Sequence, residues 1–140
     1  MKKALVTGAS RGIGFAIAKA LSDKGCRVTI TGRNAEAIKK AANKIGADVI
    51  PFVWDVSEIE IANEKINEIS NIMGGLDIVV NNAGIFAQQN EWAKNKLLQT
   101  TPKEWLTVMN TNTNALFFIM QAAVNHMLKH KTEGNILNIT

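Results

Sequence analysis

The fold of this 140-residue chain is decided by one stretch near its start, Lys3-Ala4-Leu5-Val6-Thr7-Gly8-Ala9-Ser10-Arg11-Gly12-Ile13-Gly14. Residues 4–6 form a short apolar run, which is typical of a buried parallel strand. Residues 15–21 carry apolar side chains at helical spacing. Three glycines lie between these two segments. We therefore predict a strand, a phosphate-binding turn and the start of a helix.

Each glycine of the turn has its own physical task. Gly8 lets the backbone leave the strand sharply, Gly12 lets a pyrophosphate approach the main chain, and Gly14 lets the helix pack closely on the strand. The helix N-terminus supplies free N–H groups to the anion. No Lys-Ser/Thr pair follows the last glycine, which argues against a P-loop nucleotide triphosphatase. Taken alone, the spacing of the three glycines has an alternative interpretation, a tight strand-to-helix connection that binds no ligand.

Composition indicates one globular domain. The chain is 46% hydrophobic and 20% charged, and its net charge of +4 comes from dispersed residues, which argues against a nucleic-acid partner. No apolar run has the length of a membrane span, and the N-terminus has no pattern of a secretory signal. The single cysteine, Cys26, allows no internal disulfide, so we expect a cytoplasmic protein.

The second predicted strand, residues 27–31, ends at a cation that indicates the cofactor. In a dinucleotide-binding unit, an acidic residue at this strand tip selects the free ribose 2′-hydroxyl of NAD, whereas a basic residue accommodates the 2′-phosphate of NADP. Here Gly32 is followed by Arg33 and no acid is present, so we expect NADP, with NAD less favoured. Arg11, within the glycine turn, is a candidate second cation. The alternative for Arg33 is a solvent-facing charge.

The later elements alternate between helix and strand patterns. Pro51 suits an edge strand, Ser57 with Glu60 is the pattern of a capping box, and Pro102 suits the first turn of a long helix. We read residues 86–101 as a loop over the site. The expected helices are 35–45, the capped segment through about residue 73, and 102–131, and the further strands are 48–54, 76–80 and 134–140.

Polar residues follow the ends of these strands. Asp55 is either a strand-end polar residue or an adenine contact, and the amides after the fourth strand can bond both backbone and a ligand. Asn112 lies on an apolar helical stripe, where its amide must find partners. His126 and His130 are one turn apart without an acidic or cysteine partner, so we expect solvent-side histidines and no metal site.

The chain resembles the short-chain dehydrogenase/reductase family, and within it the 3-oxoacyl-(acyl-carrier-protein) reductases. The motifs that carry the resemblance are Thr7-Gly8-Ala9-Ser10-Arg11-Gly12-Ile13-Gly14, Gly32-Arg33, Asp55-Val56, Asn81-Asn82-Ala83-Gly84, Asn112 and Gly134-x-Ile136-Leu137-Asn138-Ile139. Together they run through the whole chain. The resemblance implies hydride transfer between a nicotinamide and a small-molecule carbonyl or alcohol.

The resemblance also assigns roles to residues. It implies that the first motif holds the pyrophosphate, that Asp55 and Val56 meet the adenine, and that Asn82, Ala83 and Gly84 border the adenosine. Asn112 is similar to the family's asparagine that holds a water in a proton relay. The architecture expected is an α/β Rossmann-type three-layer sandwich with a parallel sheet in the order 3-2-1-4-5, and the nucleotide across strands one and four. Dimerisation through the helix of residues 102–131 is expected as well.

One departure from the family pattern concerns catalysis. The family uses a tyrosine, a lysine and a serine, but this chain has no tyrosine, and in our alignment the serine falls just past Thr140. We therefore expect the front portion of a longer reductase, inactive alone and truncated before the remaining strands of the family. The alternative is a non-catalytic NADP-binding or assembly module from a natural truncation. A methyltransferase is less favoured, because Thr7 stands where such proteins usually carry an acid.

Overall fold

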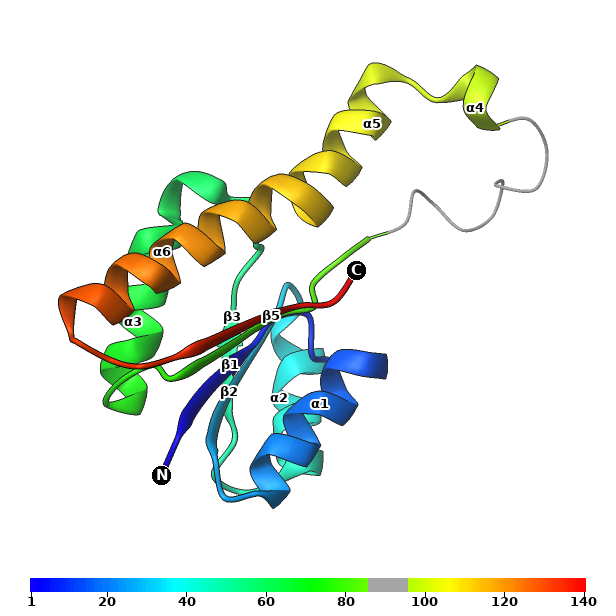
Figure 1. The fold of residues 1–140 in the computed structure, drawn as a ribbon. Coiled ribbons are helices and arrows are strands. Elements are labelled where there is room, and N and C mark those ends of the chain that lie inside the picture. Colours follow the sequence, from blue (N-terminus) through cyan, green and yellow to red (C-terminus); the bar gives the residue numbers. More distant parts are fainter. Residues whose placement is uncertain (86–95) are drawn as a thin grey trace.

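The computed structural model describes residues 1–85 and 96–140. Five parallel strands form one sheet in the order β3-β2-β1-β4-β5, which confirms the predicted order (Figure 1). The strands are β1 (Lys3–Val6), β2 (Arg27–Gly32), β3 (Ile50–Val53), β4 (Ile78–Asn81) and β5 (Asn135–Asn138). The α-helices are α1 (Gly12–Asp23), α2 (Ala35–Ile45), α3 (Ala62–Met73), α4 (Lys96–Gln99), α5 (Pro102–Met109) and α6 (Ala115–Lys129).

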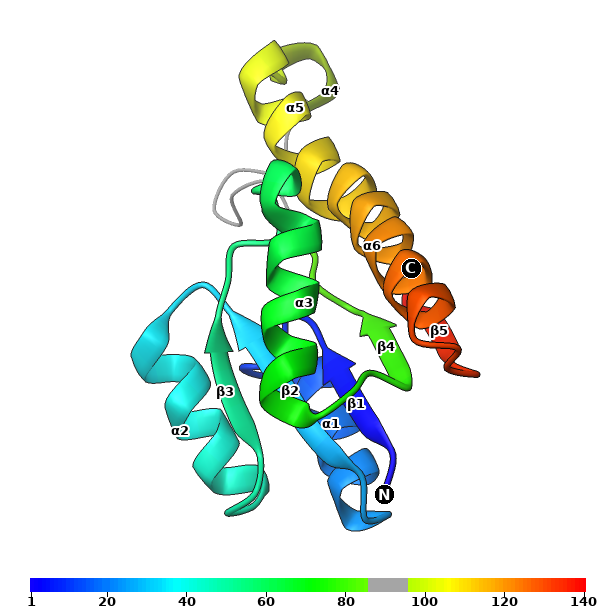
Figure 2. The same cartoon turned by 90° about the vertical axis from the view of Figure 1, so that its left-hand side faces the viewer.

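Helices cover both faces of the sheet. On one face, Ala18 of α1 and Ile38 of α2 pack with Val6 of β1 in one buried cluster. On the other face, α3 and α6 lie side by side, and Ile66 and Ile119 pack with the sheet in a second cluster (Figure 2). Parallel strands need apolar cover on both faces, which explains their nearly continuous apolar sequences. The predicted three-layer sandwich is therefore confirmed.

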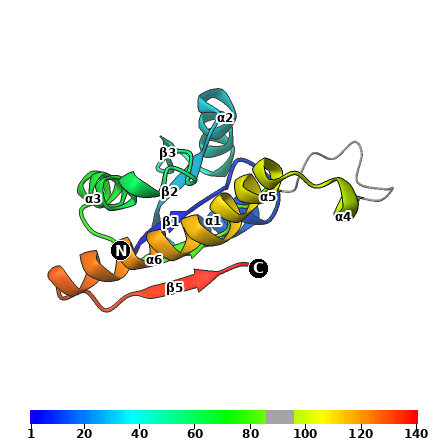
Figure 3. The ribbon, with the colours of Figure 1, turned by 90° about the horizontal axis from the view of Figure 1, so that it is seen from above.

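The two edges of the sheet differ. β3 is one edge strand, as Pro51 predicted, because proline cannot donate a ladder hydrogen bond. β5 is the other edge and lies next to α6 (Figure 3). Leu137 in this strand and Ile139 directly after it are 47% and 38% exposed. Among the described residues, no strand pairs with the outer side of β5, and such an edge with apolar side chains favours association with further protein.

The long helix begins at a capping box and contains an irregular turn. The Thr101 side chain accepts a hydrogen bond from the Glu104 backbone N–H, and the Glu104 carboxylate accepts one from the Thr101 N–H. Between α5 and α6, residues Asn110–Asn114 form a π-helical turn. The three segments make one rod that extends past the sheet (Figure 1). Such π-turns within α-helices occur frequently at functional sites.

Two local predictions are wrong. The predicted capping box of Ser57 and Glu60 does not form, because Asp55 Oδ1 accepts hydrogen bonds from both the backbone N–H and the hydroxyl of Ser57, at 3.0 and 2.7 Å. A short 3-10 turn, Ile59–Ile61, leads into α3 instead. In the predicted loop 86–101, Lys96–Gln99 is a short helix, and residues 86–95 lie outside the described part.

The prediction for His126 is also wrong, since this side chain is buried between α3 and α6. Its Nε2 is 2.8 Å from Ser70 Oγ, and its Nδ1 is 3.2 Å from Asn67 Oδ1. Burial lowers the pKa of His126, and the nearby positive charges of His130 and Lys129 add to the effect. In the described residues, no three metal-ligating side chains gather, and no helix has the length and apolar character to cross a bilayer.

Candidate functional site

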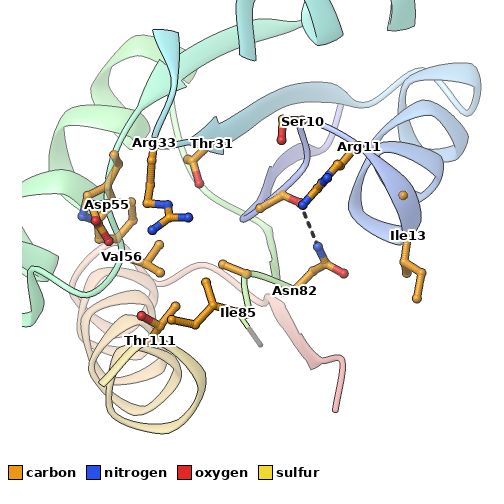
Figure 4. A pocket seen from close by; sticks show the side chains of 16 residues that line it. Ser10, Arg11, Ile13, Thr31, Arg33, Asp55, Val56, Asn82, Ile85 and Thr111 are labelled. Carbon is orange, nitrogen blue, oxygen red and sulfur yellow. Dashed lines mark hydrogen bonds between the residues drawn. The ribbon is translucent and has the colours of Figure 1, made fainter. Parts of the chain in front are cut away.

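A pocket of about 790 Å³ lies at the carboxyl ends of the central strands (Figure 4). This is where open parallel α/β sheets bind ligands, and the volume is in the range of small-molecule sites. Four strand ends and the π-turn contribute to it. Its lining residues are Gly8, Ser10, Arg11, Gly12, Ile13, Thr31, Gly32, Arg33, Trp54, Asp55, Val56, Asn82, Ala83, Gly84, Ile85 and Thr111.

Gly8 is required by both its backbone and its neighbour. Its φ is +64°, a conformation that side chains rarely adopt, and an added Cβ would lie 2.6 Å from Ala83 Cα. The chain can therefore turn out of β1 here only without a side chain. The adjacent Ala9 N–H donates to Thr31 O at 3.0 Å, which fixes the turn against the end of β2.

Gly12 differs, because open space lies where its side chain would be. Its φ is +61° and no described atom lies within 4 Å of an added Cβ. Gly12 is also the first residue of α1, whose preceding residue, Arg11, caps no backbone N–H with its side chain. No acidic residue lies in the first turn of α1. The helix therefore presents free N–H groups and its positive dipole end beside the pocket, which suits an anion.

A hydrogen-bond network ties this turn to the end of β4. The buried Thr7 hydroxyl accepts from the backbone N–H groups of Asn82 and Ala83, at 3.1 and 3.0 Å. In return, Asn82 Nδ2 donates to the carbonyl oxygens of Thr7 and Gly8, at 3.1 and 3.0 Å. The amide that sequence analysis placed near the adenosine therefore also fixes the backbone of the glycine turn.

The pocket is rich in positive charge. Arg11 comes from the glycine turn and Arg33 from the residue after β2, and among the described residues that line the pocket Asp55 is the only one with a carboxylate. The Asp55 carboxylate is already engaged by Ser57 through Oδ1. Together with the helix dipole, two guanidinium groups make a site for a ligand with more than one negative charge.

Two of the residues singled out from sequence do not line the pocket. Gly14 lies beneath the turn, where an added Cβ would collide with the Asn82 side chain and lie 2.6 Å from Gly8 O. Asn112, in the π-turn, uses its side chain to accept from the Ile85 N–H and to donate to the Ile85 O, both at 2.8 Å. The other eleven predicted site residues come together at the pocket.

Four lining residues were not identified from sequence: Thr31, Trp54, Ile85 and Thr111. The first two precede the residues that we had selected at the ends of β2 and β3. Threonine in a strand is explained equally well by β-propensity, and tryptophan by core packing, so neither gave a separate signal. For these two residues, position at the carboxyl end of a parallel strand was the available indication.

Comparison with known proteins gives one family. The model of the family described as short chain dehydrogenase matches residues 2–140. Over 98% of its length the chain is 39% identical to gluconate 5-dehydrogenase of Gluconobacter oxydans, covering 52% of that protein. Over 99% of its length the chain is 36% identical to the 3-oxoacyl-[acyl-carrier-protein] reductase FabG of Chlamydia muridarum, and it covers 55% of that protein. The chain thus spans about half the length of these relatives.

Solved structures agree with this assignment. A metagenomic short-chain oxidoreductase crystallised in complex with NADP superposes with a TM-score of 0.86 at 32% identity, over 99% of this chain and 62% of that one. The F189W actinorhodin polyketide ketoreductase with NADPH superposes with a TM-score of 0.86 at 28% identity, over 99% of this chain and 52% of that one.

Proposed function

Because this chain belongs to the short-chain dehydrogenase family, we propose that it binds NADP and forms the cofactor-binding portion of an oxidoreductase. The observation that carries this proposal is the pocket in which the free N-terminus of α1, Arg11 and Arg33 surround one space. NADP carries a diphosphate and a 2′-phosphate, and the site offers a helix N-terminus for the first and guanidinium groups for the second. A neutral ligand could accept hydrogen bonds from these groups but would leave their positive charge uncompensated.

The residues fit the cofactor in a definite orientation. The main chain at Gly12, with its neighbours Ser10 and Ile13 in the turn, would receive the diphosphate, since no Cβ at position 12 obstructs the approach. Arg33, with Arg11 as a second cation, would receive the 2′-phosphate. The other strand ends would hold the adenosine, namely Asp55 and Val56 at the adenine and Asn82, Ala83 and Gly84 along one side.

Hydride transfer is the chemistry that the nicotinamide supplies when bound. We propose that the longer protein uses it on a small carbonyl or alcohol, and that this chain alone is inactive because it contains no tyrosine to act as the acid or base. Asn112 is proposed to position a water for proton transfer, and its two bonds to Ile85 hold it in place. Carbonyl reduction by an extended version, and none by this chain, is the expected result; turnover by the 140 residues would contradict it.

Cofactor selection tests the proposal most simply. We expect the chain to bind NADPH more tightly than NADH in calorimetric titrations. Arg33→Gln should weaken NADPH binding by about tenfold or more, because a hydrogen bond to a charged group contributes about 1.5–3 kcal/mol, and leave NADH binding unchanged. Lys39→Gln, an exposed cation on α2 outside the pocket, is the matched control. Equal affinity of the unmodified chain for both cofactors, or tighter binding of NADH, would refute the NADP assignment.

We also propose that the chain self-associates through the long helix. Large apolar side chains are exposed along it, including Trp105 (59%), Phe117 (54%) and Leu128 (72%). Exposed apolar surface of this kind marks protein contacts. Sedimentation should show dimers or larger species at micromolar concentration, and Phe117→Asp should shift the chain toward monomer. A monomer of the unmodified chain under these conditions would contradict the proposal.

A further inference from the structure

Four buried side-chain atoms have no hydrogen-bond partner among the described residues: Thr29 Oγ1, Thr31 Oγ1, Trp54 Nε1 and Asn81 Oδ1. Buried polar atoms are nearly always hydrogen-bonded, because leaving one unpaired costs free energy. The four atoms fall into two groups. Thr31 and Trp54 line the pocket, whereas Thr29 and Asn81 do not. Two residues of the pocket wall therefore carry a polar group that no described residue satisfies.

Thr31 is the better placed of the two. It is fully buried at the carboxyl end of β2, and its carbonyl accepts from the Ala9 N–H at 3.0 Å, so its backbone is fixed by the glycine turn. Figure 4 shows its side chain at the pocket wall, with Arg33 to one side and Ser10 to the other. Thr31 thus lines the pocket between the predicted diphosphate and 2′-phosphate sites, where we propose that the adenosine lies, and its hydroxyl oxygen is buried in the pocket wall.

We propose that Thr31 is a further cofactor-binding residue, whose hydroxyl hydrogen-bonds the adenosine half of the dinucleotide. This inference rests on the function proposed above. A hydroxyl both donates and accepts, and adenosine offers ring nitrogens, an amino group and ribose hydroxyls as partners. The Thr31 hydroxyl has no partner among the described residues, so it breaks no hydrogen bond with them when it bonds the cofactor. Nearly the whole free energy of the new hydrogen bond therefore adds to the affinity for the cofactor.

Thr29 provides a matched control within the same strand. It lies two residues earlier, on the same face of β2, and its hydroxyl is likewise buried and without a partner among the described residues. It differs from Thr31 in lying away from the pocket. Thr→Val at either position keeps the shape of the side chain and removes only the hydroxyl. Neither change should lower the melting temperature of the free chain, since each removes an unpaired buried polar group.

The test is calorimetric titration of NADPH and of 2′,5′-ADP, which is the adenosine half alone, into the 140-residue chain. Thr31→Val should raise both dissociation constants about fivefold, a change typical of one neutral hydrogen bond, whereas Thr29→Val should leave both unchanged. Thr31→Ser, which retains the hydroxyl, should bind within about twofold of the unmodified chain. Equal affinities for the two valine variants would overturn the inference. So would a serine variant as weak as the valine variant, because packing and not the hydroxyl would then be responsible.

The outcomes separate this inference from the proposed function. Absence of binding of any nicotinamide dinucleotide to the unmodified chain would refute both. Normal binding by the unmodified chain, with no difference between Thr31→Val and Thr29→Val, would refute the role of Thr31 alone and leave the NADP site intact.

Discussion

Replacing Thr7 by valine should destabilise the chain strongly for an isosteric change. Thr7 is 1% exposed at the end of β1, and its hydroxyl accepts from two backbone N–H groups, those of Asn82 and Ala83. The hydroxyl also lies 3.4 Å from Val80 O, to which it donates. Valine has the same shape but accepts no hydrogen bond. Two backbone donors at the end of β4 therefore lose their acceptor at once.

The magnitude follows from these two donors. A buried donor left unpaired costs about 1–3 kcal/mol, and both groups are only partly buried, so we take the lower half of that range for each. The expected loss in free energy of unfolding is about 3 kcal/mol. Urea denaturation followed by circular dichroism measures it directly. With a urea slope of about 2 kcal/mol per molar, the midpoint should fall by about 1.5 M.

Thr7→Ser is the control, because serine keeps the hydroxyl and loses only a methyl group. It should lose about 1 kcal/mol or less. The same variants test the link between the network and the pocket, since Thr7→Val should also weaken NADPH binding by loosening the glycine turn. A valine variant whose unfolding midpoint matches that of the serine variant would show that the hydroxyl does not hold the end of β4, and the reasoning would be wrong.

The remaining predictions concern a histidine and a glycine. The pKa of His126 is lowered mainly by burial, so on acidification the unfolded chain takes up a proton near pH 6.5, before the folded chain does. The buried neutral histidine therefore contributes fully to the free energy of unfolding above pH 6.5, and this contribution is lost as the pH falls toward the folded pKa. Urea midpoints at pH 7.5 and 5.5 should therefore differ less in His126→Gln than in His130→Gln, and equal differences would contradict the burial of His126. Gly12→Ala should lower the free energy of unfolding by only about 1–2 kcal/mol, because the φ of +61° strains alanine but the space around it is open. The same change should abolish NADPH binding. Retained NADPH binding would exclude a close approach of the diphosphate at this position.

Much of the fold could be predicted because its signals are local. Short apolar runs bounded by glycines mark the strands, and the Pro51 position in β3 indicated an edge, which the sheet order confirms. That most of the selected residues lie together was predictable for the same reason. These residues follow strand ends, and the carboxyl ends of parallel strands meet at one edge of a sheet. Eleven of the thirteen selected residues line one pocket.

What could not be predicted depends on partners far away in sequence or on competing local bonds. His126 reads as a surface residue on its own helix, and only Ser70 and Asn67 of α3 explain its burial. Asn112 needed a partner, but nothing local identified the backbone of Ile85. At Ser57 the error had a local cause, since Asp55 Oδ1 already accepts the Ser57 backbone N–H that the Glu60 carboxylate would bind in a capping box, and it also fixes the Ser57 hydroxyl.

The most direct test of the NADP site is an NMR titration of the ¹⁵N-labelled chain with NADP. The proposed site predicts saturable shifts of the backbone amide signals of Ser10, Gly12, Ile13 and Arg33, and none along the exposed face of α5. Signals of the glycine turn that stay in place at millimolar NADP, while the protein remains folded, would contradict the claim that this turn receives the diphosphate.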